Sequence, residues 1–340
     1  MIGRVYRLID TKRIELKQRE IPLSADTVLV RPEYLSICAA DQRYYLGQRR
    51  KEVLRQKLPM ALIHEATGTV IKDFSGCLAN GTKVVLLPLD ESGAGEAGIK
   101  GNYRPESNFA SSGSDGFMRD VVAISGDRLI PIGEDYSNIY VFTELLSVAL
   151  GAIKAFETAR QTPAEPLGVW GDGSMGFMTA LALRCQYPQT KIYAFGKSAR
   201  KLSKFSFATD KHYVDAVPND LIVNHAFECV GGRKSEDALK QIMDHISPQG
   251  TVNLLGVSEN TVGIDTRRVL DKGLQLIGNS RSDKSDFEEA AALIRDNEIC
   301  RKYIGLLVSE VVEVKSDDDI PHAFEQDVLN DFKTVIKWEI

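Results

Sequence analysis

The chain has 340 residues, of which 43% are hydrophobic and 26% are charged, as in ordinary globular proteins. Its length favours two domains over one core, and its formal net charge of -5 disfavours a general binder of nucleic acid or anionic membranes. We identify no apolar run near 18 residues and no charged-then-apolar leader. We therefore expect no membrane span, no signal peptide and a cytoplasmic location.

The first part of the chain, up to about residue 147, is predicted to be mainly β. Residues 27–31, 68–72 and 83–88 have strand character, and glycines mark the turns between them. Between residues 89 and 116 the pattern changes to Gly, Ser, Glu and Asn, which indicates a long surface lobe without a core of its own.

From about residue 148 to residue 281, short apolar strands alternate with helices, which predicts a parallel sheet covered on both faces. The predicted strands are 167–170, 192–195, 213–214, 225–230, 251–257 and 274–278, and the predicted helices begin near residues 174, 198 and 235. A helix near 287–295 and a strand at 333–340 are expected to return to the first domain.

A glycine-rich turn follows the first of these strands. Gly171, Gly173 and Gly176 have the G-x-G-x-x-G spacing of a dinucleotide-binding turn. The first glycine permits the tight bend, the second lets the backbone approach a pyrophosphate, and the third lets the following helix pack on its strand. We expect cofactor contacts from six consecutive residues: Gly171, Asp172, Gly173, Ser174, Met175 and Gly176.

The turn after the second strand indicates which dinucleotide is bound. NAD-selective enzymes usually carry Asp or Glu about 20 residues beyond the glycines, where the carboxylate binds the ribose 2′-hydroxyl. This chain has no acid in that turn and offers Lys197, Ser198, Arg200 and Lys201 instead. Ammonium and guanidinium groups suit a 2′-phosphate, so we predict NADPH, the alternative being a solvated helix start.

The five cysteines are scattered, odd in number and without paired spacing, so we expect no disulfides. Cys38, His64, Glu65 and Glu144 offer a thiolate, an imidazole and two carboxylates, a set that suits Zn²⁺ with one position left open. Ordinary explanations also exist, namely a buried apolar cysteine, a polar bend at residues 64–65 and a favourable helix-start charge at residue 144.

Several motifs resemble those of the zinc-containing medium-chain dehydrogenase/reductase superfamily, in the same order and spacing over essentially the full length. They are Cys38 with Asp41, His64-Glu65 with Gly68, and residues 81–85, 144–146, 171–176 and 228–232. The resemblance implies an α/β protein with a GroES-like, mainly-β catalytic domain, residues 1–147 and 282–340. A Rossmann NADP-binding domain with a doubly wound parallel sheet, residues 148–281, is inserted in it.

The same resemblance implies a catalytic zinc ion in the cleft between the domains. Cys38, His64 and Glu144 are its implied ligands, and Glu65 is a neighbour that can join them transiently.

The chain departs from the family pattern in three places. Residues 89–116 lack the four cysteines of a structural zinc, so one zinc per chain is expected. Ala40 replaces the usual Ser or Thr of the proton relay, and Ile63 stands where Gly is usual, so we expect a different backbone geometry there.

Particular segments, among them ICAADQRYYLG at 37–47 and HAFECVGGR at 225–233, resemble the ribulose-5-phosphate reductases. This resemblance implies reduction of D-ribulose 5-phosphate to D-ribitol 5-phosphate for teichoic acid or capsule. It also implies a homodimer or larger assembly and a possible association with a ribitol-5-phosphate cytidylyltransferase. Arg43, Lys57 and Arg281 are candidates to hold the substrate phosphate, although each is also explained as a surface or structural base.

Two other functions stay open at this point. A glutamate in place of a second thiolate ligand is more like the polyol dehydrogenase branch, so an unphosphorylated polyol or sugar is an alternative substrate. The second alternative is a non-catalytic protein that only binds NADPH, which predicts a poorly formed metal site.

Overall fold

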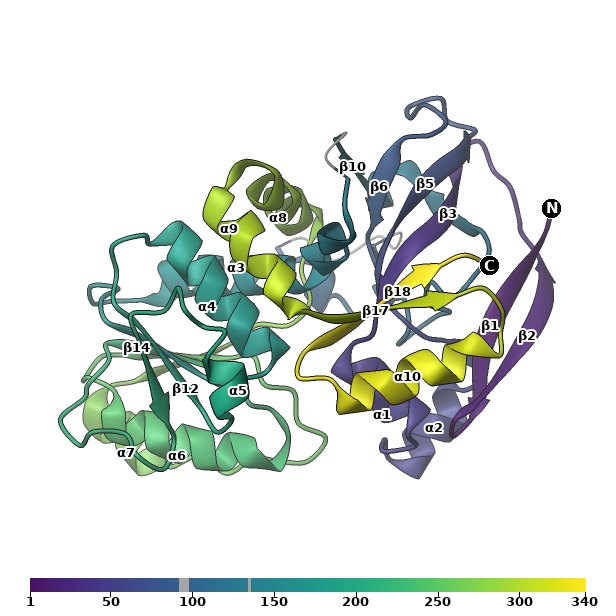
Figure 1. Cartoon of the computed structure of the whole chain (residues 1–340). Coiled ribbons are helices and arrows are strands. Elements are labelled where there is room, and N and C mark those ends of the chain that lie inside the picture. Colours follow the sequence, from purple (N-terminus) through teal and green to yellow (C-terminus); the bar gives the residue numbers. More distant parts are fainter. Residues whose placement is uncertain (92–97, 134–135) are drawn as a thin grey trace. The chain divides into compact units, whose positions relative to one another are not determined.

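The computed structural model describes residues 1–91, 98–133 and 136–340, and the chain divides into two compact units (Figure 1). The first unit consists of Met1–Glu144, Ser282–Asp296 and Leu307–Ile340, and the second of Leu145–Arg281 and Asn297–Leu306. The domain boundaries expected from the sequence, 147/148 and 281/282, stay a prediction. The compact units differ from them mainly in residues 297–306, which pack with the second unit.

Two β-sheets dominate the first unit (Figure 1). A three-stranded antiparallel sheet has the order β2-β1-β4, with β1 (Ile2–Asp10), β2 (Arg13–Glu20) and β4 (Met60–Ala61). A seven-stranded sheet has the order β10-β6-β5-β3-β18-β17, and β9 also pairs with β3. Its strands are β3 (Thr27–Ser36), β5 (Glu65–Asp73), β6 (Lys83–Leu86), β9 (Val122–Ser125), β10 (Leu129–Ile132), β17 (Val308–Val314) and β18 (Lys333–Trp338). Because β18 pairs with β3, the end of the chain completes the sheet that the beginning started.

Four helices accompany these sheets: α1 (Ala39–Tyr45), α2 (Lys51–Lys57), α8 (Lys284–Asp296) and α10 (Asp319–Leu329). Aromatic pairs connect the two ends of the chain in the core. Tyr45 on α1 stacks on Phe324 of α10 with ring centroids 4.4 Å apart, and Tyr6 meets the edge of Trp338 at 5.4 Å. Such pairs add to the free energy of burial, so the late segments are integral to this core.

The expected surface lobe, residues 89–116, is described in part. It contains a two-stranded sheet of β7 (Leu89–Asp90) and β8 (Asn108–Phe109), and residues 92–97 lie outside the described residues. Phe109 and Ala110 are buried, and Ala110 belongs to the core of the first unit. The end of the lobe therefore contributes to the main core.

The second unit is built on a six-stranded parallel sheet of order β13-β12-β11-β14-β15-β16. The strands are β11 (Leu167–Trp170), β12 (Ile192–Gly196), β13 (Asp210–Tyr213), β14 (His225–Glu228), β15 (Thr251–Leu254) and β16 (Gln275–Gly278). The helices are α3 (Thr143–Ala159, from Leu145 on), α4 (Ser174–Gln186), α5 (Ala199–Leu202), α6 (Ser235–His245), α7 (Thr266–Lys272) and α9 (Glu298–Ile304). In chain order this is the 3-2-1-4-5-6 arrangement of a Rossmann sheet, in which ligands bind at the carboxyl ends of the strands.

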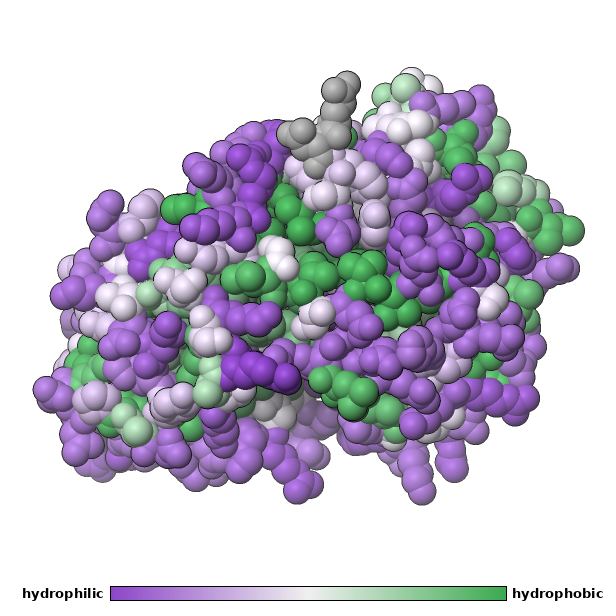
Figure 2. All heavy atoms as spheres, viewed as in Figure 1, coloured by the Kyte–Doolittle hydropathy of each residue, from purple (hydrophilic) through white to green (hydrophobic). Residues whose placement is uncertain are grey.

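One helical stretch, Asn138–Ala159, corrects the expectation that no apolar run approaches 18 residues. By length and composition it could cross a membrane, with a mean hydropathy of 1.6. However, 78% of its most apolar window is buried inside the protein, as in a core helix. Hydrophilic side chains make up most of the face drawn in Figure 2.

Candidate metal centre and nucleotide pocket

Cys38 lies where β3 leads into α1, and its side chain caps that helix. The Sγ atom accepts a hydrogen bond from the backbone N of Ala40 at 3.5 Å, and Oδ2 of Asp41 accepts one from the backbone N of Cys38 at 3.2 Å. This reciprocal pair is a capping box, which satisfies two backbone donors at the helix start. The sulfur atom therefore has a position set by the backbone around it.

The loop before β5 fixes the position of His64. Ile63 has a φ of 70°, the left-handed region that glycine adopts without strain and that costs other residues roughly 1–2 kcal/mol. Oδ1 of Asp41 accepts a hydrogen bond from the Ile63 nitrogen at 3.0 Å, and Phe117 donates its backbone N–H to the Ile63 oxygen at 2.8 Å. The backbone thus keeps a glycine-type conformation although a β-branched residue occupies the position.

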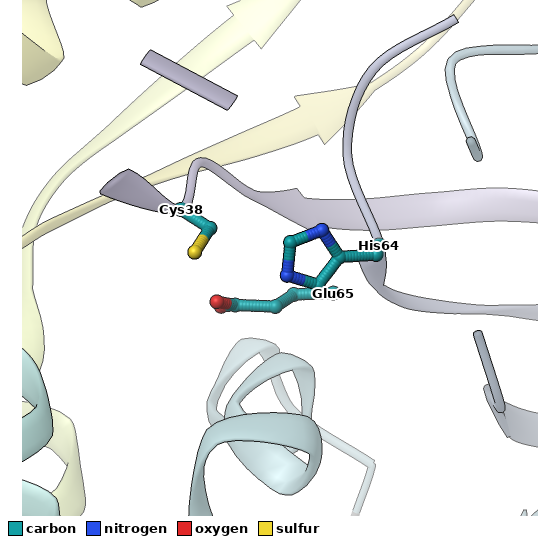
Figure 3. Close-up of side chains that lie close together, drawn as sticks. All are labelled: Cys38, His64 and Glu65. Atoms are coloured by element: carbon teal, nitrogen blue, oxygen red, sulfur yellow. The ribbon is translucent and has the colours of Figure 1, made fainter. Parts of the chain in front are cut away.

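Three of the four predicted metal residues come together. A ligand atom each from Cys38, His64 and Glu65 lies within 4.8 Å of the others, and Figure 3 shows the three side chains pointing toward one another. Among the described residues this is the one group of three or more His, Cys, Asp or Glu side chains arranged in this way. Glu144, in the first turn of α3, is buried close enough to interact electrostatically with His64 and Glu65.

Lys333, at the start of β18, is a residue of this cluster that sequence reasoning missed. Its Nζ atom lies 2.5 Å from Oε1 of Glu65 and donates to the Ile37 carbonyl at 3.1 Å, and both side chains of the ion pair are buried. The other Glu65 oxygen, Oε2, is buried without a hydrogen-bond partner among the described residues. One oxygen is thus held by Lys333, while the other is an acceptor suited to a bound cation. In the sequence, the feature that could have indicated this role is a lysine at the start of an apolar strand.

Asp41 connects the two segments that carry Cys38 and His64. Its carboxylate is fully buried and accepts hydrogen bonds from the backbone of Cys38 and Ile63 and, at 2.5 Å, from the Ser111 hydroxyl. Nδ1 of His64 lies 3.8 Å from Oδ2 of Asp41. At this distance the Asp41 carboxylate acts on the imidazole ring through its charge and not through a hydrogen bond.

The cluster carries an excess of buried negative charge. Asp41, Glu65 and Glu144 face Lys333 and His64 within the set of interacting groups. Burial raises the pKa of Glu144 to about 7, against the opposing effect of His64. Burial lowers the pKa of His64, but Asp41, Cys38 and Glu144 raise it more, so the pKa lies well above its usual range. Buried anions of this kind are stable only when paired, and a divalent metal ion would supply the missing positive charge.

The residues present therefore fit a zinc ion. Sulfur, imidazole nitrogen and carboxylate oxygen are its usual donors, and a site with three protein ligands leaves one position for substrate or water. The described residues of the 89–116 lobe belong to no second such group, and that lobe has no cysteine.

The glycine turn in the second unit has the geometry that its sequence predicted. Gly171 has a φ of 126°, and a Cβ atom at Gly176 would lie 1.8 Å from the Gly171 carbonyl oxygen. A Cβ atom at Gly173 would meet nothing within 4 Å. The first and third glycines are thus required by the fold, while the open space at the second leaves room for a phosphate group.

A cavity of about 360 Å³ opens at this turn, within the second unit. It is lined by Trp170, Gly171, Asp172, Gly173, Phe195, Gly196, Lys197, Val214, Cys229, Val230, Lys234, Asp237, Ala238 and Gln241. Among the predicted cofactor residues, Ser174, Met175 and Gly176 continue into α4, and Ser198, Arg200 and Lys201 lie at or in α5, outside this lining. Lys234 is a lining cation that the sequence analysis did not single out.

The carboxylate of Asp172 is engaged by the turn after β12. Its Oδ2 atom accepts hydrogen bonds from the backbone N–H groups of Lys197 and Ser198, both at 2.7 Å. Asp172 therefore orders the segment that carries the predicted 2′-phosphate residues. It acts on the cofactor site through the position of Lys197.

The three candidates for the substrate phosphate lie in different elements. Arg43 is half-buried on α1, five residues after Cys38, and Lys57 is half-buried at the end of α2. Arg281 belongs to the second unit, where burial lowers the pKa of its guanidinium group. The first two belong to the same unit as the metal cluster.

Comparison with known proteins defines the class first. The profile of the alcohol dehydrogenase GroES-like domain matches residues 24–134. The crystal structure of Staphylococcus aureus TarJ in complex with NADPH superposes with a TM-score of 0.88 at 41% sequence identity, covering 100% of both chains. A GroES-like unit with a Rossmann unit and a catalytic-type metal cluster is the fold of the medium-chain dehydrogenases/reductases.

Full-length relatives define the family within that class. Ribulose-5-phosphate reductase 1 of Staphylococcus aureus (strain NCTC 8325 / PS 47) is 46% identical over 341 residues, covering 99% of both chains. The ribulose-5-phosphate reductase of Bacillus spizizenii is 43% identical over 342 residues, covering 100% of both. The chain belongs to the ribulose-5-phosphate reductase family of medium-chain dehydrogenases/reductases.

Proposed function

We propose that this protein is a zinc-dependent enzyme that uses NADPH to reduce D-ribulose 5-phosphate to D-ribitol 5-phosphate. The observation that carries the proposal is the convergence of Cys38, His64 and Glu65 in a chain with 43–46% identity to ribulose-5-phosphate reductases over its whole length. A non-catalytic NADPH-binding protein would have no need for this buried set of metal donors. We also propose a cytoplasmic location, because NADPH is available there.

The chain's own residues have defined roles in this proposal. Cys38 and His64 bind the zinc ion, together with a carboxylate from Glu144 or Glu65, and one zinc ion is bound per chain. When bound, zinc polarises the substrate carbonyl as a Lewis acid and NADPH supplies the hydride. Lys333 holds Glu65 in place, and Asp41 orients the cysteine and histidine segments, so both are positioning residues.

The glycine turn would hold the pyrophosphate of NADPH, and the basic residues after β12 its 2′-phosphate. Gly173 allows the close approach, and Lys197 lies in the cavity wall beside it. Lys234 adds a second cation to that wall, while Ser198, Arg200 and Lys201 extend the basic segment. Charge-assisted hydrogen bonds from such groups favour a phosphate over a hydroxyl.

Arg43 and Lys57 lie in the same unit as the metal cluster and are our first candidates to bind the substrate phosphate. Arg281 is kept as a third. Replacing a phosphate-binding cation should raise KM for ribulose 5-phosphate and leave the weaker reaction with ribulose unchanged. Equal effects on both substrates would show that the replaced residue does not bind the phosphate.

NADPH oxidation with ribulose 5-phosphate and with free ribulose, before and after chelation, tests the proposal. We expect efficient turnover of the phosphorylated ketose only, loss on removal of zinc and recovery on its return. Equal efficiency on ribulose would favour the unphosphorylated polyol alternative. NADPH binding without turnover of any ketose would favour the non-catalytic one.

We also propose a homodimer or larger assembly. Strand β16 is the last strand in the order of its sheet, and its residues Leu276 and Ile277 are half-exposed, so its free edge offers pairing to a second copy. Sedimentation of the purified protein should give a dimer that Ile277→Lys weakens.

An association with a ribitol-5-phosphate cytidylyltransferase, which would consume the product, is a further proposal to be tested by co-purification.

A further inference from the structure

Two cysteines far apart in the sequence lie together in the second unit. Cys185 is the penultimate residue of α4, and Cys300 lies in the first turn of α9. The two helices pack against each other (Figure 1), and the two thiols lie close enough for each to shift the pKa of the other. Neither cysteine belongs to the metal cluster or to the wall of the nucleotide cavity.

Asn297 fixes the positions of the two cysteines relative to each other. Its Oδ1 atom accepts a hydrogen bond from the Cys185 thiol at 3.7 Å and another from the backbone N of Cys300 at 2.9 Å. The second bond is the side-chain cap of α9. One side-chain oxygen thus fixes where both cysteines lie, so their proximity does not depend on a mobile loop.

The two thiols differ in ways that suit different chemical roles. Cys185 is half-buried, whereas Cys300 has no exposed surface. The hydrogen bond from Cys300 and the nearby charge of Arg184 lower the pKa of Cys185 against the effect of burial. The same hydrogen bond and burial raise the pKa of Cys300. Cys185 is therefore the thiol that ionises first and that a small reagent can reach.

The Arg184 guanidinium, whose charge acts on Cys185, is hydrogen-bonded to neutral groups. The hydrogen-bond acceptors of this guanidinium among the described residues are the carbonyl oxygens of residues 187, 188, 190 and 207 and the Thr209 hydroxyl, all of them neutral. No carboxylate on the described chain takes part in this network. A neighbouring cation of this kind stabilises a thiolate.

We propose that Cys185 and Cys300 are a reversible thiol–disulfide pair, in which Cys185 reacts first with a peroxide and Cys300 resolves the product. A half-exposed thiol that ionises readily beside a second, buried thiol is the arrangement typical of redox-sensitive cysteines. Both cysteines are free thiols in the structure. This inference does not rest on the proposed reductase activity.

The chemistry balances with a peroxide as the oxidant. The Cys185 thiolate attacks one peroxide oxygen and the O–O bond breaks, which leaves a sulfenic acid on Cys185 and a hydroxide ion. The proton that the Cys185 thiol lost on ionising converts this hydroxide to one molecule of water. The Cys300 sulfur then attacks the Cys185 sulfur, the S–O bond breaks, and its hydroxyl leaves as a second molecule of water with the Cys300 proton. The two thiols lose two electrons in total as they form the disulfide, and a dithiol reductant reverses the step.

The pair would protect the second unit from irreversible damage. A sulfenic acid without a partner is oxidised further to sulfinic and sulfonic acids, whereas a disulfide is not. The other cysteines lack this arrangement: Cys77 is exposed, Cys229 is buried against the Thr179 hydroxyl, and Cys38 belongs to the metal cluster. The structure therefore makes Cys77 the natural control.

The test is peptide mass spectrometry on the full-length, zinc-loaded protein. The reduced protein is exposed to hydrogen peroxide, free thiols are alkylated, and tryptic peptides are separated without reductant. We expect a cross-link between the peptides CQYPQTK (185–191) and DNEICR (296–301) that disappears after treatment with dithiothreitol. The same cross-link should form in Cys77→Ser.

Variants assign the order of events. Cys300→Ser should accumulate a sulfenic acid on Cys185 that a dione probe traps, and Cys185→Ser should leave Cys300 as a free thiol. In the wild-type protein, oxidation of Cys77 while Cys185 and Cys300 stay reduced would overturn the proposal. Sulfinic acid at Cys185 without any cross-link would overturn it as well, and neither result depends on the folding of a variant.

Discussion

The metal cluster and the glycine turn are built in opposite ways. The cluster gathers side chains from the start of α1, the start of β5, α3 and β18, residues separated by up to 295 positions between Cys38 and Lys333. The glycine turn uses the backbone of six consecutive residues, and its function depends on the space that missing side chains leave. The first site is therefore sensitive to the loss of a charge partner, and the second to the gain of a methyl group.

The largest expected effect is the loss of a metal ligand. Cys38→Ser should lower kcat by about 1,000-fold or more, because the polarising metal contributes several kcal/mol to the transition state. Zinc content, measured by mass spectrometry of the dialysed protein, should fall in parallel, while the Kd for NADPH stays close to the wild-type value. Cys77→Ser is the matched control and should change none of the three; zinc retained in Cys38→Ser would contradict the ligand role.

Loss of the charge partner in the same cluster should mainly lower stability. Lys333→Met leaves the Glu65 carboxylate buried without its cation, which costs about 3–5 kcal/mol in comparable buried pairs. Urea unfolding measures this effect. The control is Lys315→Met, whose side chain is 64% exposed and whose loss should change stability by less than about 0.5 kcal/mol. Equal stability of the two variants would show that the buried pair does not hold Glu65.

Substitutions in the glycine turn should distinguish the glycine that folding requires from the glycine that NADPH binding requires. Gly176→Ala places a methyl group 1.8 Å from a carbonyl oxygen, which should cost about 1–3 kcal/mol of stability and weaken NADPH binding. Gly173 has a φ of -83° and open space around it, so Gly173→Ala should fold normally but bind NADPH about tenfold more weakly, a change of about 1.4 kcal/mol. Calorimetric titration of NADPH together with thermal unfolding distinguishes the two. Unchanged NADPH affinity in Gly173→Ala would place the pyrophosphate elsewhere.

The choice between NADPH and NADH tests the basic segment after β12. Lys197→Ala should raise KM for NADPH about tenfold, since one charge-assisted hydrogen bond contributes about 1.5–3 kcal/mol, and should leave KM for NADH unchanged. Lys191→Ala, which removes an exposed lysine at the other end of β12, is the control. A parallel rise for both cofactors would mean that Lys197 does not contact the 2′-phosphate.

The smallest expected effect concerns a histidine outside both sites. Burial lowers the pKa of His225 below its usual 6.5, and its Nδ1 accepts a hydrogen bond from the Thr251 nitrogen at 3.0 Å. Because the unfolded state then binds a proton more readily, the stability that neutral His225 contributes is complete above about pH 6.5 and falls as the pH drops below it. Fluorescence of Trp170 in a Trp338→Phe background reports on the second unit. His225→Gln in that background should show a shallower loss below pH 6.5; an identical loss would exclude His225 as its cause.

The sequence predicted the second unit better than the first for physical reasons. The turn at 171–176 is contiguous, and strand β11 is buried along its whole length, so a continuous apolar run marks it. The hairpin of β1 and β2 was not predicted, because six of the eight residues of β2 are exposed and only Ile14 and Leu16 are apolar. The strand β17 and helix α10 were missed for a related reason, since exposed charged residues interrupt their apolar positions.

For the metal cluster too, the sequence indicated some residues and not others. Cys38, His64 and Glu65 were identified from their types and order, but the assignment of ligand and neighbour between Glu144 and Glu65 depends on distances that a sequence does not contain. Lys333 and Ser111 were not predicted as parts of the cluster, because only the pairing of β18 with β3 and the fold of the 89–116 lobe bring them there. Asp41 was recognised as part of a motif, while its hydrogen bonds to both ligand segments emerged from the structure.

The most direct test of the account combines zinc content with turnover of D-ribulose 5-phosphate by NADPH. The account predicts one zinc ion per chain, loss of turnover in step with zinc during chelation, and recovery when zinc is returned. Full turnover by metal-free protein that also carries Cys38→Ser would contradict it.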